Sequence, residues 1–423
     1  MASEASQPIQ GMSDLAAPEV CLWQEVEACA RRVLDLYGFE EIRTPVLERT
    51  KVFQRSLGDT TDVVQKEMYT FEDRGRRSLT LRPEGTAGVM RHLSGRGPEA
   101  QEARLFYWGP MFRSERPQAG RRRQFHQLGV EAMGAPNPVA DAEVLALQVH
   151  LLSEWGLTGS TVEINTRGTF DDRKAVLEGL REALRPNLSA LGEDDRRRFD
   201  ENVLRVLDSK DPAAQEIVAN LPPVTDFMAA ESRQYLDEVL RWLKVYNIDV
   251  KVNPRLVRGL DYYAHTVWEI THPALGAQDA LAGGGRYQIS LAGKTLEGVG
   301  FAMGIERVLG ALQKVRGDDV GGEVRPLVWL ASQGEAAFAE NLVLLQTLRQ
   351  RGIRARMDLS GRSLKAQMRA ANRADATVVI VRGEQEIENG LFQVKDMASS
   401  TQEELTMPEV LERLSGLHLQ ASS

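Results

Sequence analysis

The segment that most restricts the fold is residues 102–134, EARLFYWGPMFRSERPQAGRRRQFHQLGVEAMG. Two aromatic-rich stretches flank a loop that contains Pro117 and Gly120. Aromatic and β-branched residues favour strands, and proline and glycine favour the turn between them. The segment therefore predicts a long β-hairpin.

The two faces of this hairpin differ in chemistry. Every second residue of a strand shares a face. One face is then formed by Leu105, Tyr107, Gly109, Met111 and Arg113 of the first strand and by Phe125, Gln127, Gly129 and Glu131 of the second. An arginine, an amide, a carboxylate and glycines on neighbouring strands indicate a surface where the backbone approaches a polar ligand. The alternative is a solvent-exposed face with an ordinary arginine-rich turn.

The loop of the hairpin is strongly basic. It concentrates five arginines in eleven positions, although the whole chain has a formal net charge of −8: Arg113, Arg116, Arg121, Arg122 and Arg123. An acidic chain is a poor general coat for nucleic acid, but a local cluster of arginines still attracts an anion. The loop is therefore a candidate anion site.

Composition limits the remaining possibilities. A chain of 423 residues, 42% of them hydrophobic, has room for about two to four domains. Apolar runs such as TVVIV are far shorter than the ~18 residues of a membrane helix, so no membrane contact is expected. Cys21 and Cys29 form no CxxC pair and no HExxH occurs, which argues against structural zinc and disulfides and favours a reducing cytoplasm.

Patterns before and after the hairpin outline the first domain. Helical spacing over 23–39 predicts a helix that Gly38 terminates, and EEIRTPVLE reads as a strand. Residues 78–93 begin as a strand, break at a proline and a glycine, and resume as a helix, which leaves Glu84 and Thr86 at a strand end. Charge-rich helical segments separated by LPPVTDF then indicate a helical insertion.

The remaining segments predict a return to the sheet and then a separate domain. RGLDYYAHTVWEIT, LAGGGRYQ and GVGFAMGIERVLGAL combine strand signals with glycines and end in a helix. The glycine run lacks the Walker lysine and the GxGxxG spacing, so it predicts neither a P-loop nor a Rossmann nucleotide-binding loop. After a charged linker at 316–326, strands alternate with helices, which predicts a small α/β domain with a mixed sheet.

Two further segments carry ligand-binding side chains. RGLDYY places Arg258 three residues before Asp261 and ahead of Tyr262 and Tyr263, which offers a guanidinium for a phosphate or carboxylate and hydroxyls for a nitrogen-bearing ligand. A helix beginning around MGIERVL would direct its first amides and Arg307 outward as an anion site. The alternatives are a buried Arg/Asp pair that supports a turn and a capped core helix.

These segments together resemble the class II aminoacyl-tRNA synthetases, and among them the histidyl-tRNA synthetase family, over nearly the whole chain. FEEIRTPVLE is similar to motif 1, GPMFRSERPQAGRRRQFHQLGVEAMG to motif 2 and GVGFAMGIERVL to motif 3. RGLDYY and LAGGGRY resemble two signatures of the histidine enzymes, and TLRPEGT resembles their substrate loop.

The resemblance implies an α+β fold and four segments. A catalytic domain built on an antiparallel sheet would cover 1–167 and 251–320, a helical insertion 168–250, and a C-terminal α/β anticodon-binding domain 326–415. A homodimer is implied, with motif 1 at its interface. The implied reaction joins ATP and L-histidine as histidyl-adenylate, with Mg²⁺ accompanying ATP and no metal held by the protein alone. Histidine then passes to the 3′ end of histidine tRNA.

The resemblance also implies residue roles. Arg258 and Arg113 would be the catalytic residues, with Arg258 contacting the histidine carboxylate and the α-phosphate together. Arg113 and Arg307 would hold the α- and γ-phosphates of ATP. The histidine pocket would comprise Glu84, Thr86, Arg113, Gln127, Glu131, Arg258, Tyr262 and Tyr263. The acceptor end of the tRNA would meet Arg116, Gln118, Arg121, Arg122 and Arg123. Preorganised guanidinium groups suit the charge that builds up when a carboxylate attacks phosphorus.

Three departures from the family pattern stand beside these motifs. Gln288 replaces an acid after GGRY, Ala264-His265 replaces a more polar pair, and Gln10 replaces an arginine before Gly11. The first two put the affinity of the histidine pocket in doubt, and the third the docking of the N-terminal segment.

Three other functions compete with this prediction. The synthetase-like regulatory subunit of ATP phosphoribosyltransferase shares the catalytic fold, but it typically lacks the C-terminal domain and loses motif residues. A class II synthetase for proline, threonine or glycine would lack RGLDYY followed by GGGRY. A nucleotide-binding interaction protein would show no histidine-dependent ATP turnover.

Overall fold

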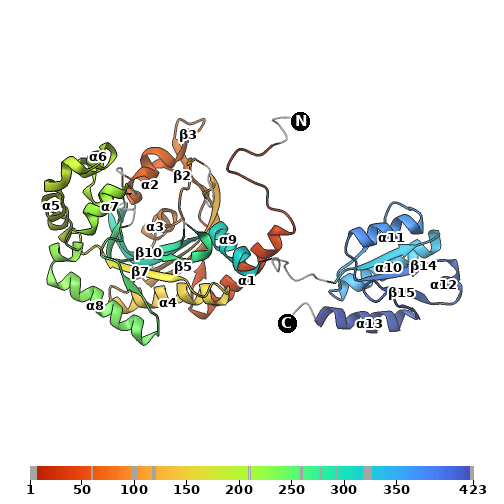
Figure 1. The fold of residues 1–423 in the computed structure, drawn as a ribbon. Coiled ribbons are helices and arrows are strands. Elements are labelled where there is room, and N and C mark those ends of the chain that lie inside the picture. Colours follow the sequence, from red (N-terminus) through yellow and green to blue (C-terminus); the bar gives the residue numbers. More distant parts are fainter. Residues whose placement is uncertain are drawn as a thin grey trace. The chain divides into compact units, whose positions relative to one another are not determined.

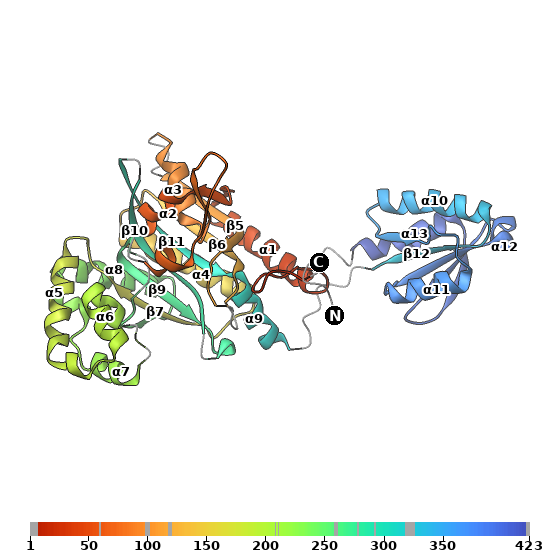
Figure 2. The same cartoon turned by 90° about the horizontal axis from the view of Figure 1, so that it is seen from above.

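The computed structural model describes residues 7–58, 61–97, 102–116, 121–207, 209, 211–257, 261–276, 279–291, 293–317 and 326–419. The chain divides into two compact units, Met1–Val320 and Gly321–Ser423 (Figures 1 and 2). Arg258 and Gln118 lie outside the described residues.

An eight-stranded sheet forms the centre of the first unit. Its order is β1 (Glu40–Glu41), β5 (Arg104–Phe112), β6 (Gln124–Met133), β11 (Lys294–Gly304), β10 (Ala280–Leu291), β9 (Tyr263–Thr271), β7 (Thr161–Thr166) and β8 (Lys251–Val252). The pairs from β5 to β7 are all antiparallel, and only the two outermost pairs are parallel. The predicted antiparallel sheet is confirmed.

The predicted hairpin consists of β5 and β6. Leu105 lies opposite Glu131 and Gly109 opposite Gln127, so the two sets of side chains assigned to one face do share that face. The opposite face carries Phe106, Leu128 and other apolar residues of the largest core. The alternation of side chains therefore separates an apolar face from a polar one.

Helices cover the two faces of the sheet unequally. The apolar face packs against α1 (Glu19–Leu36), α4 (Pro138–Glu154), α8 (Ala230–Val245) and α9 (Ile305–Arg316). The other face packs against α2 (Thr50–Leu57) and α3 (Thr86–Ser94), on the opposite side of the sheet from α4 in Figure 1. Two short helices leave part of that face uncovered for a cavity.

Local sequence explains where several of these helices begin or end. The Asn137 side chain accepts a hydrogen bond from Ala140 N (3.1 Å), and Pro138 follows as the first residue of α4, an arrangement that satisfies the free amides of a helix start. The predicted terminator Gly38 has φ +70° two residues after α1, a conformation that favours glycine.

The segment predicted as one strand, EEIRTPVLE, is divided in the structure. Glu40–Glu41 joins the large sheet as β1, whereas Leu47–Arg49 forms β2 of a three-stranded sheet with β4 (Ser78–Leu81) and β3 (Tyr69–Glu72). Pro45 lies between the two pieces. Because proline has a fixed φ and no N–H to donate, it interrupts the ladder and lets the chain change sheets.

A group of helices between β7 and β8 has a core of its own. It comprises α5 (Asp172–Leu184), η4 (Arg185–Ala190), α6 (Glu193–Glu201), η5 (Val203–Val206), α7 (Pro212–Ala219) and η6 (Val224–Phe227). Val176, Leu180, Phe199 and Val203 are buried among these helices, which lie at one end of the first unit in Figure 2. Helix α8 then leads back to the sheet. Three residues of this group, Asn202, Leu204 and Arg205, also line the cavity of the candidate active site.

The second unit is an α/β domain with a mixed five-stranded sheet. Strand β12 (Val328–Ser332) pairs in parallel with β13 (Ala355–Met357) and β14 (Val378–Arg382), and β15 (Phe392–Asp396) and β16 (Gln402–Leu405) add antiparallel strands. The helices are α10 (Glu335–Gln350), α11 (Leu364–Arg373), α12 (Glu384–Glu388) and α13 (Met407–Leu419). The predicted mixed sheet is confirmed. Within the described ranges, no helix has the length and apolar character to cross a membrane.

Candidate active site

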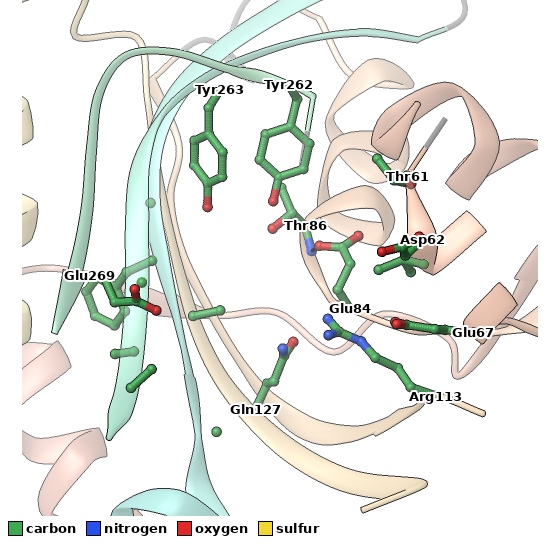
Figure 3. Close-up of a pocket in the computed structure, with 18 of the residues that line it drawn as sticks. Thr61, Asp62, Glu67, Glu84, Thr86, Arg113, Gln127, Tyr262, Tyr263 and Glu269 are labelled. Carbon is green, nitrogen blue, oxygen red and sulfur yellow. Dashed lines mark hydrogen bonds between the residues drawn. The ribbon is translucent and has the colours of Figure 1, made fainter. Parts of the chain in front are cut away.

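A cavity of about 760 Å³ opens on the polar face of the hairpin. Its walls come from β6, β9, β10, β11, the strand end after β5 and the first residues of α3. The predicted site residues that line it are Glu84, Thr86, Arg113, Arg121, Arg122, Gln127, Glu131, Tyr262, Tyr263 and Arg307. Figure 3 shows Glu84, Thr86, Gln127, Tyr262 and Tyr263 pointing into this space, with Arg113 on the side of Glu67. The structure therefore brings the separate motifs together.

Glycines in and beside the cavity leave room for two large side chains. A Cβ atom on Gly129 would lie 2.0 Å from Tyr107 Cζ, and one on Gly85 would lie 2.2 Å from Tyr107 Cε2. On Gly300 it would lie 2.5 Å from Glu131 Oε2. Any side chain at these positions would displace Tyr107 or Glu131, so the glycines fix the shape of the cavity.

Glu84 is held at the start of α3. Its two carboxylate oxygens accept hydrogen bonds from Thr86 N and Ala87 N, each at 2.8 Å. Burial raises the pKa of the Glu84 carboxyl, and the two backbone amides partly offset that effect. Arg113 donates through Nε to Pro83 O at 3.0 Å. The break between β4 and α3 thus sets a carboxylate beside a guanidinium group.

Glu131 and Gln127 supply acceptors deeper in the cavity. Burial raises the pKa of the Glu131 carboxyl to about 8, and the Tyr287 and Thr86 hydroxyls, which lower this pKa, offset only part of the effect. Among the described residues no ion pair involves Glu131, and the buried Gln127 Oε1 accepts no hydrogen bond. Buried acceptors of this kind are stabilised by a ligand rich in N–H donors.

Tyr287 is a cavity residue that the sequence analysis did not assign. It is 2% exposed and lines the cavity with Glu131. A signal for it existed, because strand alternation places it on the same face as Gly283 and Gly285 of β10. Asp62, Glu67 and the insertion residue Arg205 also line the cavity, and no local pattern marks them.

Arg307 occupies the first turn of α9, as predicted. It lines the cavity, and its Nη1 donates to Ala280 O. Burial lowers the pKa of this guanidinium, and nearby Arg121 lowers it further, whereas Glu269 and Asp279 raise it. The start of α9 is anchored because the neighbouring Glu306 accepts a hydrogen bond from His126 N at 2.9 Å. Arg113 and Arg307 provide two fixed cationic groups on one cavity.

The arginines predicted to contact tRNA occupy different surroundings. Arg121 pairs with Glu115 at 3.1 Å, and Arg122 donates to Ser13 Oγ at 2.9 Å. Arg123 donates to Glu115 O at 3.3 Å. Arg116 is exposed. Arg121 and Arg122 therefore lie at the rim of the cavity, whereas the guanidinium of Arg123 binds the protein backbone.

None of the departures from the family pattern, Gln10, Ala264-His265 and Gln288, is a lining residue of the cavity. Gln288 donates through its side chain to Glu297 at 2.9 Å and does not line the cavity. The ring of His265 stacks on Tyr235 with centroids 4.2 Å apart. Beside Gln10, the Gly11 carbonyl accepts from Arg123 N at 2.8 Å, so the N-terminal segment docks on the hairpin end through its backbone.

Comparison with known proteins identifies this arrangement. Residues 11–308 match the family model for histidyl-tRNA synthetase, and residues 328–417 match an anticodon binding domain. The histidine–tRNA ligase of Pelotomaculum thermopropionicum is 45% identical over 412 residues, covering 96% of this chain and 96% of the relative. That of Cyanothece sp. is 44% identical over 412 residues, covering 96% of this chain and 95% of the relative. The chain belongs to the histidyl-tRNA synthetase family.

A solved structure agrees with this membership. The crystal structure of apo S. aureus histidyl-tRNA synthetase matches with a TM-score of 0.79 at 34% identity and covers 97% of this chain and 99% of the other. As a member of the histidyl-tRNA synthetase family, the chain is a ligase that attaches histidine to tRNA with ATP as a substrate. The α+β fold, the family and the ligase function predicted from sequence are confirmed.

Proposed function

We propose that the cavity is where the chain activates L-histidine. The histidine carboxylate attacks the α-phosphorus of ATP, a carboxylate–phosphate anhydride forms, and pyrophosphate leaves. The observation that carries this assignment is the presence, in one cavity, of buried N–H acceptors beside Arg113. The acceptors suit histidine and the guanidinium suits a phosphate.

The part of the cavity that contains the buried hydrogen-bond acceptors is proposed to bind histidine. Glu131, Gln127, Tyr262 and Tyr263 would accept hydrogen bonds from or donate them to the imidazole and ammonium groups, and Glu84 and Thr86 would complete the pocket. In support, the Tyr262 and Tyr263 rings are adjacent, with centroids 4.7 Å apart, and their hydroxyls face the cavity in Figure 3. Proton donors of a bound ligand would satisfy groups that burial leaves without water.

The basic end is proposed to bind ATP. Arg113 would contact the α-phosphate and the histidine carboxylate, Arg307 the γ-phosphate, and Arg258, which lies outside the described residues, both the carboxylate and the α-phosphate. These groups would stabilise charge on the equatorial oxygens as phosphorus is attacked. Alignment of carboxylate and phosphorus would supply much of the acceleration, and no protein nucleophile is needed.

Mg²⁺ is proposed to arrive with ATP. Among the described residues, no group of three or more His, Cys, Asp or Glu side chains could hold a metal ion. Magnesium usually takes one or two carboxylates together with phosphate oxygens and water. Glu269 and Asp279 line the cavity near Arg307 and fit such a partial ligand set. The ion would neutralise phosphate charge.

Transfer to tRNA is proposed to use both units. Arg116, Gln118, Arg121, Arg122 and Arg123 would meet the acceptor end of histidine tRNA beside the cavity. Residues 326–415 would bind its anticodon. The exposure of Arg116 and the position of Arg121 and Arg122 at the cavity rim support the first assignment.

A cytoplasmic location is proposed from the two free cysteines, Cys21 and Cys29. A homodimer is proposed from the small three-stranded sheet. Leu47, Phe71 and neighbouring Val46 are 41%, 46% and 36% exposed. The pairing of β2 and β3 with β4 puts Leu47 and Phe71 on one face with Leu79 and Leu81. An apolar sheet face of this kind is covered most simply by a second copy of the chain.

The direct test is pyrophosphate exchange into ATP with each common amino acid in turn. Histidine alone is expected to support exchange, because the pocket offers buried acceptors to a ligand rich in N–H groups. Preference for proline, threonine or glycine would contradict the assignment of the pocket, and folded protein without any exchange would contradict the activation step.

A further inference from the structure

The helical insertion supplies part of the cavity wall. Asn202, Leu204 and Arg205 line the same cavity as Arg113 and Tyr263. They belong to or precede η5, whose Val203 and Val206 are buried in the core of the insertion. The position of this wall therefore depends on how the insertion is attached to the catalytic sheet.

One attachment is an ion pair at the edge of the cavity. Arg205 Nη1 lies 3.2 Å from Asp62 Oδ1, and Nη2 makes a second, shorter contact with Oδ2. Two parallel contacts fix the relative orientation of a guanidinium and a carboxylate. The partners are 143 residues apart in sequence, and Figure 3 shows Asp62 near Thr61 at the cavity. The pair thus joins the insertion to the segment after α2.

This segment leads directly to Arg113. Asp62 is the residue before the π-helical turn η2 (Val63–Glu67). At its other end, Glu67 O accepts a hydrogen bond from Ser114 N at 2.7 Å. Ser114 follows Arg113 in the chain, so the backbone that carries Arg113 is fixed to one end of η2. The Arg205–Asp62 pair fixes the opposite end.

A second attachment holds the other side of the cavity. Arg173 of α5 donates through Nη2 to Asp261 O at 2.6 Å. Asp261 directly precedes Tyr262 and Tyr263. The insertion consequently contacts both the tyrosine wall and the Arg113 wall.

We propose that Arg205 and Asp62 are a positioning pair for amino-acid activation, through which the insertion holds η2 and the strand end that carries Arg113. The proposal rests on the proposed assignment of the cavity to histidine and ATP. An insertion that served only to contact tRNA would not influence a reaction carried out without tRNA. Here the first step depends on the insertion even in the absence of tRNA.

The size of the effect follows from the exposure of the pair. Both side chains are about one third exposed, 36% for Arg205 and 37% for Asp62, and ion pairs in contact with water contribute little to overall stability. Placement of a reacting group is more sensitive than stability, because small shifts reduce rates strongly. Breaking the pair should therefore affect activation without unfolding the protein.

The test compares variants of the full chain in ATP–pyrophosphate exchange without tRNA. The set is Arg205→Gln, Asp62→Asn, their double variant and Arg205→Lys. The matched control is Arg197→Gln, which removes another arginine of the insertion that pairs with an aspartate, Asp194, at 3.1 Å and is well exposed. Because Asp62 also faces Lys66 at 3.8 Å, the double variant separates the Arg205 pair from that second contact.

We expect Arg205→Gln to lower kcat/KM for ATP roughly two- to fivefold, the upper part of the range for a solvent-exposed ion pair, with an unchanged unfolding temperature. The double variant should be no worse than the poorer single variant, and Arg205→Lys should recover part of the loss. The KM for histidine should change less than about twofold, because η2 borders the Arg113 side.

Two results would overturn the pair's role while leaving the proposed function intact. Arg205→Gln could behave like Arg197→Gln, with both as active as the parent, or the two single losses could simply multiply in the double variant. If the parent and Arg197→Gln themselves show no histidine-dependent exchange, the proposed function fails and this inference fails with it.

Discussion

Two buried carboxylates on opposite sides of β10 show how differently this fold treats the same chemical group. Asp141 of α4 accepts from Arg286 Nε at 2.9 Å and Nη2 at 2.5 Å, and from Thr266 Oγ1 at 2.6 Å. The Asp141 carboxylate more than offsets the burial of Arg286 and raises the pKa of that guanidinium. Burial raises the pKa of the Asp141 carboxyl as well, although Arg286 opposes this and lowers it. Asp141 therefore has its cation within the protein.

Glu131 is equally buried but is arranged in the opposite way. Its hydrogen-bond partners Tyr287 and Thr86 are neutral, and burial, with a smaller contribution from the nearby Glu84 carboxylate, raises its pKa to about 8. Arg286 and Tyr287 are consecutive residues of β10, so strand alternation sends the cation to the helix side and the phenol to the cavity side. A carboxylate paired internally supports the fold, whereas one left with neutral hydrogen-bond partners is available to a ligand with N–H donors.

The largest expected effect is the loss of stability when the buried Arg286–Asp141 pair is broken. Arg286→Met should lower the free energy of unfolding by about 3–5 kcal/mol, because Asp141 would stay buried without its cation. Urea unfolding followed by tryptophan fluorescence measures this, since five of the six tryptophans precede residue 320. The control is the double variant Asp141→Leu/Arg286→Met, in which apolar packing replaces the pair and most stability should return. A loss below about 1 kcal/mol in the single variant would remove the contrast with Glu131.

Changing the cavity carboxylate Glu131 should weaken ligand binding without a loss of stability, the reverse of the result expected for Arg286→Met. Glu131→Gln should weaken histidine binding roughly 10- to 100-fold, the range for losing a hydrogen bond to a charged group at about 1.5–3 kcal/mol. Stability should stay constant or rise, because the variant removes a buried ionisable group that has no cation among the described residues. Calorimetric titration with histidine and urea unfolding test the two halves. A large loss of stability would show that Glu131 supports the fold as Asp141 does.

The smallest expected effect is the release of a proton from Glu131 on unfolding or on histidine binding. With a folded-state pKa of about 8 against an ordinary value of 4.5, ligand-free Glu131 holds a proton at pH 7 that the unfolded chain lacks. Unfolding releases that proton, so the free energy of unfolding should fall as pH rises from about 4.5 to 8. Histidine binding near pH 7.5 should release up to about one proton, because the ionised carboxylate is the better acceptor.

Titration calorimetry in two buffers of different ionisation enthalpy measures this release. Glu131→Gln serves as the control and should bind histidine without it. An unchanged proton count in that variant would assign the proton to another group, such as Glu84, whose pKa burial also raises.

Local sequence was sufficient for the parts of the site that depend on short-range geometry. Strand period alone placed Leu105 and Gly109 on one face of the first strand, and Gln127 and Glu131 on one face of the second. Which of these residues stand opposite one another was decided by the pairing of the strands. The position of Glu84 at a strand-to-helix junction followed from Pro83 and Gly85. The roles of Arg258 and Gln118 came from family resemblance and stay predictions, since both residues lie outside the described ranges.

Other features depended on contacts between distant segments. Pro45 marked a break, but only the pairing of β1 with β5 and of β2 with β4 showed that the chain changes sheets there. The contact of Arg205 with Asp62 spans 143 residues, and no local pattern records it.

The amino-acid sequence by itself determined where strands and helices alternate, which hairpin face is polar and that Gly38 follows the end of a helix, because these depend on side-chain period and backbone sterics within a few residues. Tertiary structure decided which buried carboxylate is paired with a cation. Asp141 and Glu131 are both buried acidic residues, and the strand pattern that placed Glu131 on the polar face did not show whether a cation pairs with either of them. Arg286 reaches one and Tyr287 the other because successive residues of β10 point to opposite faces of the sheet, one toward α4 and one toward the cavity. The pKa of a buried carboxylate depends on the groups folded against it, so the difference between a structural pair and a ligand site arises only in the folded chain.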